Sequence, residues 1–207
     1  MGRRIHYAVV HREDGLERQK AALRHHMRAL RRSIPADQRA AWSATICRRA
    51  LQLAKAHSVR TAHVYLAFGD EVDTDPLIRA MLASGMRVVA PIYLLGSTAT
   101  PCARITSLDK AAFTLDSRGL RHPRSVTLVA PEVVDAVFAP LLAFGPPADG
   151  RPGIARLGRG SGYYDRLLAQ LRPDALKAGL AFACQRVPTL PVAPHDALLD
   201  VVVTEAD

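Results

Sequence analysis

His63-Val-Tyr-Leu-Ala-Phe68 is an apolar run of the length of a buried strand, and it opens the stretch that decides the predicted fold. An acidic turn follows at residues 69–73, and Thr74 stands at the N-cap position of a predicted helix that ends at Ala83. Residues 87–93 form the next predicted strand. A strand, a helix and a strand with short connections indicate an α/β fold with a mostly parallel sheet.

Further elements are predicted on both sides of this stretch. We expect helices at residues 16–33, 36–55 and 163–171, and strands at residues 126–129, 136–144, 176–184 and 200–204. Residues 94–125 are expected to hold only short strands and turns. No repeat or change of composition marks a boundary, so we predict a single domain over residues 1–207, with residues 1–15 as a poorly ordered extension.

The composition is that of a water-soluble protein of ordinary size. The 207 residues are 49% hydrophobic and 23% charged, and no apolar run approaches the roughly 20 residues that span a bilayer. The first residues are too polar for a signal peptide, and the three cysteines have no metal-ligand spacing. We therefore expect a cytoplasmic protein with reduced cysteines and no membrane partner.

The net charge of +9 raises the possibility of nucleic-acid binding. Residues 1–32 hold nine basic and three acidic side chains, a net charge of +6, which leaves +3 for the other 175 residues. A surface that binds polyanions generally would spread its charge more widely. We keep a nucleic-acid-binding protein as an alternative, and we expect no nucleic-acid partner.

The helix predicted at residues 16–33 has an apolar and a basic stripe. The apolar stripe is Leu23, Met27, Leu30 and Ile34, and the basic stripe is Lys20, Arg24, Arg28 and Arg31. The two stripes are displaced from each other by roughly 80° around the helix axis. The basic stripe either faces a cleft or is a solvated flank, and the spacing alone favours the flank.

A second stretch, Arg156-Leu-Gly-Arg-Gly-Ser-Gly-Tyr-Tyr-Asp-Arg166, combines three glycines and three arginines before a predicted helix. Glycine permits positive φ and leaves the backbone N–H groups uncovered. Backbone donors, guanidinium groups and a helix N-terminus together favour a polyphosphate. The alternative is a flexible turn in a basic protein.

Three common glycine motifs do not fit this stretch. A Walker A loop requires a lysine after its last glycine, and none is present. A dinucleotide fingerprint requires other glycine spacing directly after a strand, whereas these glycines alternate and are expected to follow a long loop. A nucleophile elbow would not place Ser161 directly between two glycines.

Asp165 follows these glycines, and its carboxylate has two interpretations. It is either a partner of the helix dipole or a ligand of Mg²⁺. A second carboxylate from another loop would favour the metal, and Asp196 is the candidate. The sequence alone does not bring the two together.

The stretch from Arg156 to Arg166 resembles the signature of the 5-formyltetrahydrofolate cyclo-ligases, also called methenyltetrahydrofolate synthetases. The resemblance extends to Lys20-Ala-Ala-Leu-Arg24 and to the acidic turn at residues 70–74. It continues in order through Cys184-Gln185, Leu190-Pro191, His195-Asp196 and Val203-Thr204-Glu205. Two positions depart from the pattern, since Gly145 replaces an aspartate and His122 replaces a glutamate that many members carry.

The resemblance implies a three-layer Rossmann-like fold and a ligase that forms a C–N bond. The substrates would be ATP and 5-formyltetrahydrofolate, possibly polyglutamylated, and the products 5,10-methenyltetrahydrofolate, ADP and phosphate. Mg²⁺ would be required, and the protein would be a monomer or a weak homo-oligomer. A small-molecule kinase, which would release a stable phosphorylated product, is a further alternative.

The resemblance also assigns roles to residues. It implies ATP binding by Lys20, Arg24, Arg156, Gly158, Arg159, Gly160, Ser161, Gly162, Tyr163, Tyr164 and Asp165. It implies substrate binding by Leu66, Glu71, Tyr163 and Tyr164, metal binding by Asp165 and Asp196, and catalytic roles for Arg159 and Tyr163. One of the two tyrosines could equally be a core aromatic at a helix start.

Overall fold

The computed structural model describes residues 2–93 and 97–206, with side chains from Gly15 onward. Its centre is a seven-stranded sheet in the order β11-β10-β7-β1-β2-β3-β6. The strands are β1 Thr61–Val64, β2 Arg87–Pro91, β3 Cys102–Ile105, β6 Leu128–Val129, β7 Ala136–Pro140, β10 Leu176–Leu180 and β11 Val201–Val203. The five strands from β11 to β2 are parallel, and β3 and β6 are antiparallel to their neighbours. The predicted α/β fold with a mostly parallel sheet is confirmed.

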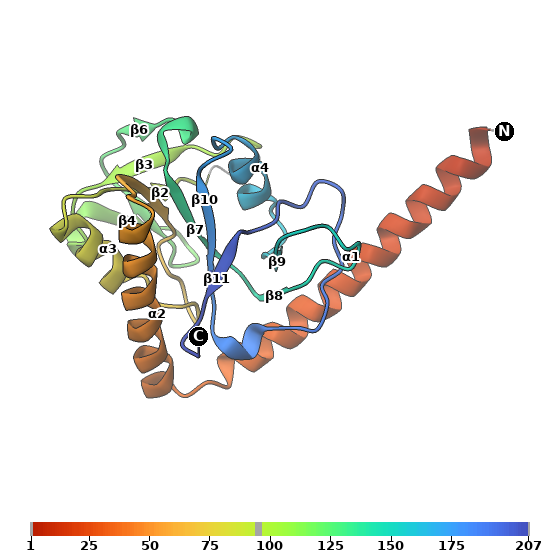
Figure 1. The fold of residues 1–207 in the computed structure, drawn as a ribbon, viewed down its shortest axis with the longest axis horizontal. Coiled ribbons are helices and arrows are strands. Elements are labelled where there is room, and N and C mark those ends of the chain that lie inside the picture. The colour runs from red at the N-terminus through yellow and green to blue at the C-terminus, as the bar shows by residue number, and fades with distance from the viewer. Residues whose placement is uncertain (1, 94–96, 207) are drawn as a thin grey trace.

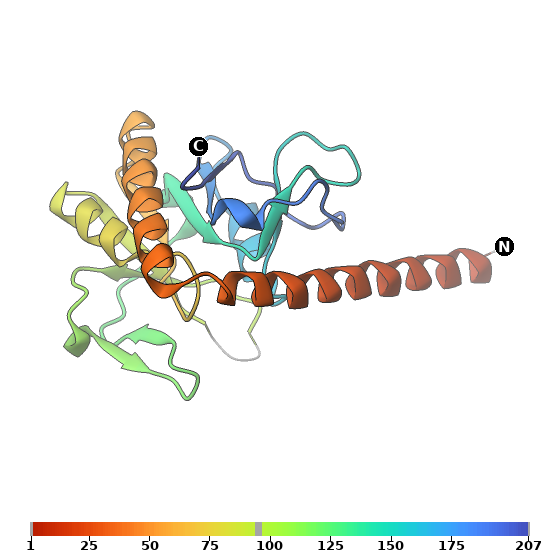
Figure 2. The same ribbon diagram turned by 90° about the horizontal axis from the view of Figure 1, so that it is seen from below.

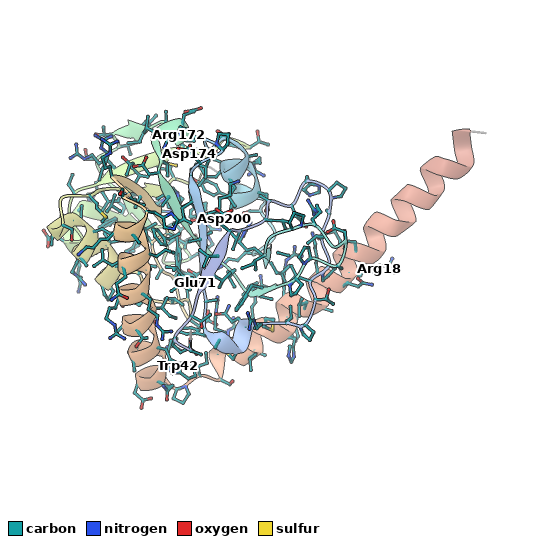
Figure 3. The ribbon with its side chains drawn as sticks, in the orientation of Figure 1. Arg18, Trp42, Glu71, Arg172, Asp174 and Asp200 are labelled. Atoms are coloured by element: carbon teal, nitrogen blue, oxygen red, sulfur yellow. The ribbon has the colours of Figure 1, made fainter. Side chains whose placement is uncertain are left out.

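Helices cover both faces of this sheet (Figure 1). They are α1 Gly2–Arg32, α2 Ala36–Ala56, α3 Asp75–Ala83 and α4 Tyr163–Ala169. Side chains alternate between the faces of a strand, and His63 of β1 meets Tyr164 of α4 with ring centroids 5.7 Å apart. On the other face Trp42 of α2, labelled in Figure 3, packs against Phe182 at 5.9 Å. The sheet and the helices on its two faces therefore make three layers.

Helix α1 is longer than the sequence predicted, because it begins at Gly2 and not at residue 16. Its N-terminal part projects beyond the body of the protein (Figure 2). Its C-terminal part lies against the body: Met27 is buried, Leu23 and Leu30 are partly buried, and Ile34, which follows the helix, is buried as well. That residues 1–15 form an extension outside a single domain stays a prediction.

Two small antiparallel sheets complete the fold. One pairs β4 Phe113–Leu115 with β5 Arg121–Pro123, and the other pairs β8 Ala143–Gly145 with β9 Ala155–Leu157. Single 3-10 turns occur at Lys110–Ala112, Pro131–Val133 and Ala183–Gln185. The second pair packs on α1 through a small apolar cluster that includes Met27, Leu142 and Leu157. This hairpin therefore fixes the position of α1 beside the main sheet.

The apolar run predicted as one strand at residues 136–144 belongs to two sheets. Strand β7 ends at Pro140, and after it the backbone N–H of Leu142 donates to the carbonyl of Leu157 at 2.7 Å. The amide of Gln185 donates to the carbonyls of Leu141 and Leu142 at 2.9 and 3.0 Å. These carbonyls are buried, so their partners stabilise the turn from one sheet to the next.

Other predicted elements differ at their ends. The strand predicted to reach residue 68 stops at Val64, and the one predicted to reach residue 184 stops at Leu180. The helix predicted to reach residue 171 ends at Ala169. Thr74 stands at the N-cap of α3 as predicted, but its hydroxyl donates to the carbonyl of Tyr65 at 2.6 Å and makes no capping bond. Thr74 thus fastens α3 to the chain that leaves β1.

Candidate functional site

A cavity of about 630 Å³ opens where the parallel strands end. Its walls come from the chain after β1 and β7, from α1, and from the loop before α4. Ligands of open α/β sheets bind at this edge, outside the carboxyl ends of the strands. Every site residue assigned through the resemblance lines this one cavity.

The loop before α4, residues 158–162 (the glycine loop), follows directly on strand β9. The prediction that these glycines follow a long loop is wrong, because β9 lies immediately before Gly158 and pairs with β8. Gly160 and Gly162 have φ values of +107° and +67°, which side chains rarely permit. A Cβ on Gly158 would lie 2.6 Å from Nη1 of Arg156. Backbone shape therefore requires Gly160 and Gly162, whereas Gly158 leaves room for the guanidinium of Arg156.

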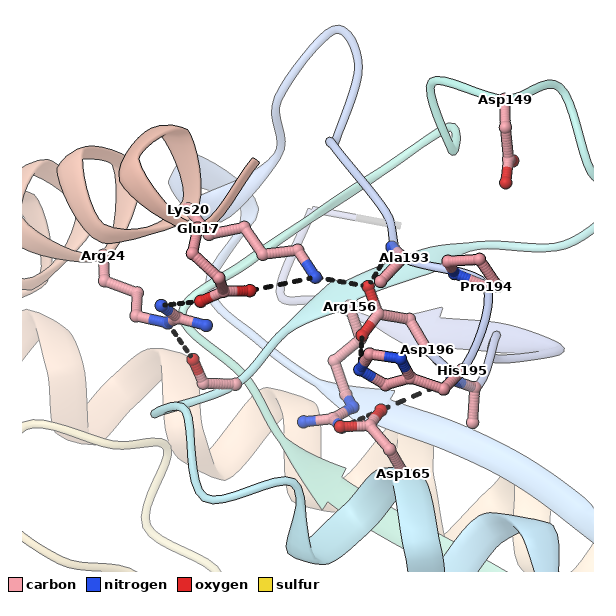
Figure 4. Close-up of polar contacts among 12 residues, drawn as sticks. Glu17, Lys20, Arg24, Asp149, Arg156, Asp165, Ala193, Pro194, His195 and Asp196 are labelled. Carbon is pink, nitrogen blue, oxygen red and sulfur yellow. Dashed lines mark hydrogen bonds and ion pairs between the residues drawn. The ribbon is translucent and has the colours of Figure 1, made fainter. Parts of the chain in front are cut away.

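The basic stripe of α1 faces the cavity, so the expectation of a solvated flank is wrong for most of it. Lys20 and Arg31 are 4% and 3% exposed, and Arg24 lines the same wall. Nε of Arg24 donates to the carbonyl of Gly158 at 3.1 Å (Figure 4). The stripe therefore contacts the glycine loop across 134 residues of sequence. Arg28 does not line the cavity.

Two carboxylates are each held by a buried cation. Nζ of Lys20 donates to Oδ2 of Asp196 at 2.5 Å, and Nη2 of Arg156 donates to Oδ1 of Asp165 at 2.8 Å (Figure 4). The backbone N–H of Ala197 also donates to Oδ1 of Asp165 at 3.4 Å. The structure therefore brings Asp165 of α4 into contact with the residue that follows Asp196 in a distant loop.

The arrangement of the two aspartates suits a divalent cation shared with a phosphate. In residues 2–93 and 97–206 no group of three or more His, Cys, Asp or Glu side chains could hold a metal alone. Among the described residues Oδ2 of Asp165 has no hydrogen bond, and Oδ1 of Asp196 is 3.9 Å from Nε2 of His195 and has no hydrogen bond either. Mg²⁺ is commonly held by one or two carboxylates together with waters and substrate phosphates, so the residues fit this ion.

The charge of Asp196 is stabilised by its neighbours. Burial would raise the pKa of this carboxyl, but hydrogen bonds from Lys20 and from the backbone N–H of Ala193, at 2.7 Å, bring the pKa below its usual value. Asp196 is therefore an anion at neutral pH.

Arg159 and Glu71 form an ion pair across the cavity. Nη2 of Arg159 donates to Oε1 of Glu71 at 2.8 Å, and the guanidinium lies over the Phe68 ring at 5.3 Å. Oε2 of Glu71 accepts the backbone N–H of Phe68 at 3.0 Å, and Figure 3 shows Glu71 within the body of the protein. Leu66 lies on the same wall and is 9% exposed. Arg159, a predicted ATP-binding residue, is thus bonded to Glu71, a predicted substrate-binding residue.

The tyrosines at the start of α4 are each 5% exposed. The hydroxyl of Tyr163 donates to the carbonyl of Pro101 at 3.0 Å, and its ring meets that of Tyr164 at 5.2 Å. Both rings reach the cavity wall, and both are packed core aromatics. The two interpretations of these tyrosines are therefore compatible.

Two cavity residues that were not assigned from the sequence are Tyr93 and Arg31. Tyr93 packs on Tyr163 with ring centroids 5.0 Å apart. Arg31 donates to Asp70 at 2.6 Å, which ties α1 to the acidic turn. Arg31 carried a signal, because it belongs to the basic stripe with Lys20 and Arg24. Tyr93 lay at the end of a predicted strand and carried none.

Gly145 stands where the resemblance pattern has an aspartate. It lies so close to the backbone of Val187 that it has no room for a side chain. A Cβ there would lie 2.3 Å from the carbonyl oxygen of Val187. The backbone N–H of Val187 donates to the carbonyl of Phe144 at 2.8 Å, which holds this close approach in place. His122, the other departure, lies outside the cavity and 3.6 Å from Asp116.

Comparison with known proteins places these features in a family. A sequence model described as the 5-formyltetrahydrofolate cyclo-ligase family matches residues 16–205. A 5-formyltetrahydrofolate cyclo-ligase from Mus musculus is 28% identical over 198 residues, which are 90% of this chain and 93% of the relative. One from Mycolicibacterium smegmatis is 31% identical over 155 residues, which are 71% of this chain and 74% of the relative.

A solved structure agrees with the sequence matches. The 5,10-methenyltetrahydrofolate synthetase of Aquifex aeolicus superposes with a TM-score of 0.74 at 28% identity, covering 91% of this chain and 90% of that one. The predicted family and ligase class are confirmed. No helix in the described part of the chain is long and apolar enough to cross a membrane.

Proposed function

Because the chain belongs to the 5-formyltetrahydrofolate cyclo-ligase family, we propose that it converts 5-formyltetrahydrofolate to 5,10-methenyltetrahydrofolate with ATP and Mg²⁺. The single observation that supports this most is the convergence of the glycine loop, the basic stripe of α1 and Glu71 on one cavity. The volume of about 630 Å³ lies within the range of cavities that hold small ligands, roughly 300–1,000 Å³.

The reaction requires the formyl oxygen to become a leaving group. That oxygen attacks the γ-phosphorus of ATP, and the bond to the β-γ bridging oxygen breaks, so ADP leaves. N10 of the folate then attacks the activated formyl carbon and loses its proton, and the C–O bond breaks to release phosphate. Phosphoryl transfer needs positioning and charge neutralisation more than covalent help from the protein.

The residues of the cavity suit those two tasks. Lys20, Arg24 and Arg159 would supply positive charge to the triphosphate, and the glycine loop would supply backbone N–H groups. Arg156 is 7% exposed and bonded to Asp165, so its guanidinium would orient that carboxylate as well as add charge. Mg²⁺, held by Asp165 and Asp196, would neutralise charge on the phosphates.

The folate would occupy the other side of the cavity. Glu71 accepts hydrogen bonds from Phe68 and Arg159 and would also accept one from the pterin. Leu66, Tyr163 and Tyr164 give apolar contact to the rings. Arg159 lies between the two substrates, and we propose that it and Tyr163 orient the formyl group toward the γ-phosphate.

The test is the absorbance of the methenyl product in a mixture of purified protein and 5-formyltetrahydrofolate. Absorbance should rise only when ATP and Mg²⁺ are both present, with one ADP and one phosphate released for each methenyl product. A folded sample that yields no methenyl product over a range of pH would overturn the proposal.

Two other functions predict other results in the same samples. A small-molecule kinase would release ADP with a stable phosphorylated product and no free phosphate. A nucleic-acid-binding protein would bind RNA or DNA with strong dependence on salt, but Lys20, Arg24 and Arg31 face the cavity. We also propose that the enzyme is cytoplasmic and acts as a monomer or weak homo-oligomer.

A further inference from the structure

Two side chains of α4 and that of Gln170, which caps it, contact residues 97–101 (the wall segment), of which Ser97 and Ala99 line the cavity. Nε of Arg166 donates to the carbonyl of Thr98 at 2.8 Å, and the Tyr163 hydroxyl donates to that of Pro101 at 3.0 Å. Nε2 of Gln170, which follows the helix, donates to Oγ1 of Thr100 at 3.0 Å. Positions 163, 166 and 170 follow the i, i+3, i+7 spacing of one helix face.

The same helix is bonded to the glycine loop. Nη1 of Arg166 donates to the carbonyl of Ser161 at 3.0 Å, and a Cβ on Gly162 would lie 2.8 Å from that nitrogen. One guanidinium therefore contacts both the glycine loop and the wall segment. The wall segment has no helix or strand of its own, so its shape depends on such contacts.

Gln170 lies outside the cavity, and so does its partner Thr100. Thr100 is 4% exposed, so water competes little for its hydroxyl. Gln170 also donates to the carbonyl of Arg166 at 2.9 Å. The bond between Gln170 and Thr100 thus joins α4 to the wall segment without touching a substrate, whereas Ser97 and Ala99 of that segment line the cavity.

We propose that α4 couples the two substrates and that Gln170 is the positioning residue of this coupling. The inference rests on the proposed cyclo-ligase function. A triphosphate that orders the glycine loop fixes the start of α4, and α4 then holds the wall segment in place for the folate. Coupling between sites is reciprocal, so the folate strengthens ATP binding by the same factor.

The test measures the dissociation constant of 5-formyltetrahydrofolate by calorimetry, without and with a saturating non-hydrolysable ATP analogue. In the unaltered protein the analogue should tighten folate binding by at least about fivefold. Gln170→Ala should lower that factor about fivefold, the effect of one lost hydrogen bond. Its folate affinity without the analogue should stay within about twofold, since Gln170 contacts no substrate.

Two further variants separate coupling from a general structural effect. Gln52→Ala changes an exposed glutamine of α2 that does not line the cavity, and it should leave the factor unchanged. Thr100→Val should lower the factor as Gln170→Ala does, and the double variant should lower it no further. A merely structural role would lower the melting temperature and leave the factor unchanged.

The outcomes distinguish the inference from the proposed function. The inference alone would be overturned if the unaltered protein forms methenyl product but shows no coupling between the substrates. It would also be overturned if the unaltered protein forms product and Gln170→Ala shows the same coupling factor. Absence of methenyl product with ATP would overturn the proposed function, and the inference with it. Loss of coupling in both Gln170→Ala and Thr100→Val, with product formed by the unaltered protein, would support both.

Discussion

Replacing Lys20 by methionine removes the buried cation that joins α1 to the loop of Asp196. Nζ of Lys20 lies 2.5 Å from Oδ2 of Asp196, and the two side chains are 6% and 13% exposed. The variant leaves the carboxylate with the backbone N–H of Ala193 as its nearest donor, at 2.7 Å. Methionine keeps the length and the apolar part of the side chain.

The magnitude follows from the loss of one charged hydrogen bond. Such bonds contribute about 1.5–3 kcal/mol, and because Asp196 keeps one donor and some contact with water, we expect a loss of about 2 kcal/mol. For a domain of this size the melting temperature should fall by about 4–8 °C. If Lys20 also neutralises phosphate charge, the KM for ATP should rise about tenfold or more while the KM for the folate changes little.

The assay is urea unfolding of four proteins, namely the unaltered chain, Lys20→Met, Asp196→Asn and the double variant. Arg18→Met is the matched control, because Arg18 is an exposed cation on the same helix, and it should change stability by no more than about 0.5 kcal/mol. The double variant should be more stable than the sum of the single effects predicts, because the two side chains act as a pair.

The pH dependence gives an independent check. The pKa of Asp196 is lower in the folded chain than its ordinary value, since the bonds from Lys20 and Ala193 outweigh burial. The pair therefore stabilises the fold above the unfolded pKa, about 3.9, and this contribution is lost as the pH falls through the lower folded value. Lys20→Met should flatten the decline of stability in acid.

Equal stability of Lys20→Met and the control at pH 7, with strictly additive effects in the double variant, would refute the reasoning. It would mean that the ion pair contributes nothing to the fold.

Three other predictions concern the same cavity. Arg159→Ala should raise the KM for ATP about tenfold or more with a smaller effect on folate binding, and collapse of folate affinity alone, by calorimetry, would show that the assignment of this arginine is wrong. Gly145→Ala should destabilise the fold by about 3 kcal/mol or more, because its Cβ would meet the Val187 oxygen at 2.3 Å, and unchanged urea unfolding would contradict this. Removal of divalent cations with EDTA should abolish methenyl formation, which Mg²⁺ should restore, whereas full activity in EDTA would argue against the role of Asp165 and Asp196.

The basic stripe of α1 shows how far a periodic pattern can be taken. Spacing predicted the apolar stripe of this helix, in which Met27 and Ile34 are buried and Leu23 and Leu30 are partly buried. It could not tell whether Lys20 and Arg24 face solvent or a cavity, because the partners that decide this, Asp196 and Gly158, lie far away in the sequence. The family signature supplied what the spacing could not.

The run at residues 136–144 shows a break that the sequence pattern could not predict. Each of its residues is apolar enough for one long strand, and all of residues 136–139 are buried. The break after Pro140 depends on the carbonyl of Leu157, which accepts from Leu142, and on the amide of Gln185, which donates to Leu141, and no local signal predicts these distant partners. The short strand β9 was missed for the same reason, since it exists only because β8 pairs with it.

The glycine loop and Glu71 meet in one cavity, and the central claim is that this cavity holds both substrates at once. The most direct test uses 5-formyltetrahydrofolate labelled with oxygen-18 in the formyl group, in a single turnover with ATP. If the formyl oxygen attacks the γ-phosphorus, the released phosphate must carry the label. Methenyl product accompanied by unlabelled phosphate would contradict the claim.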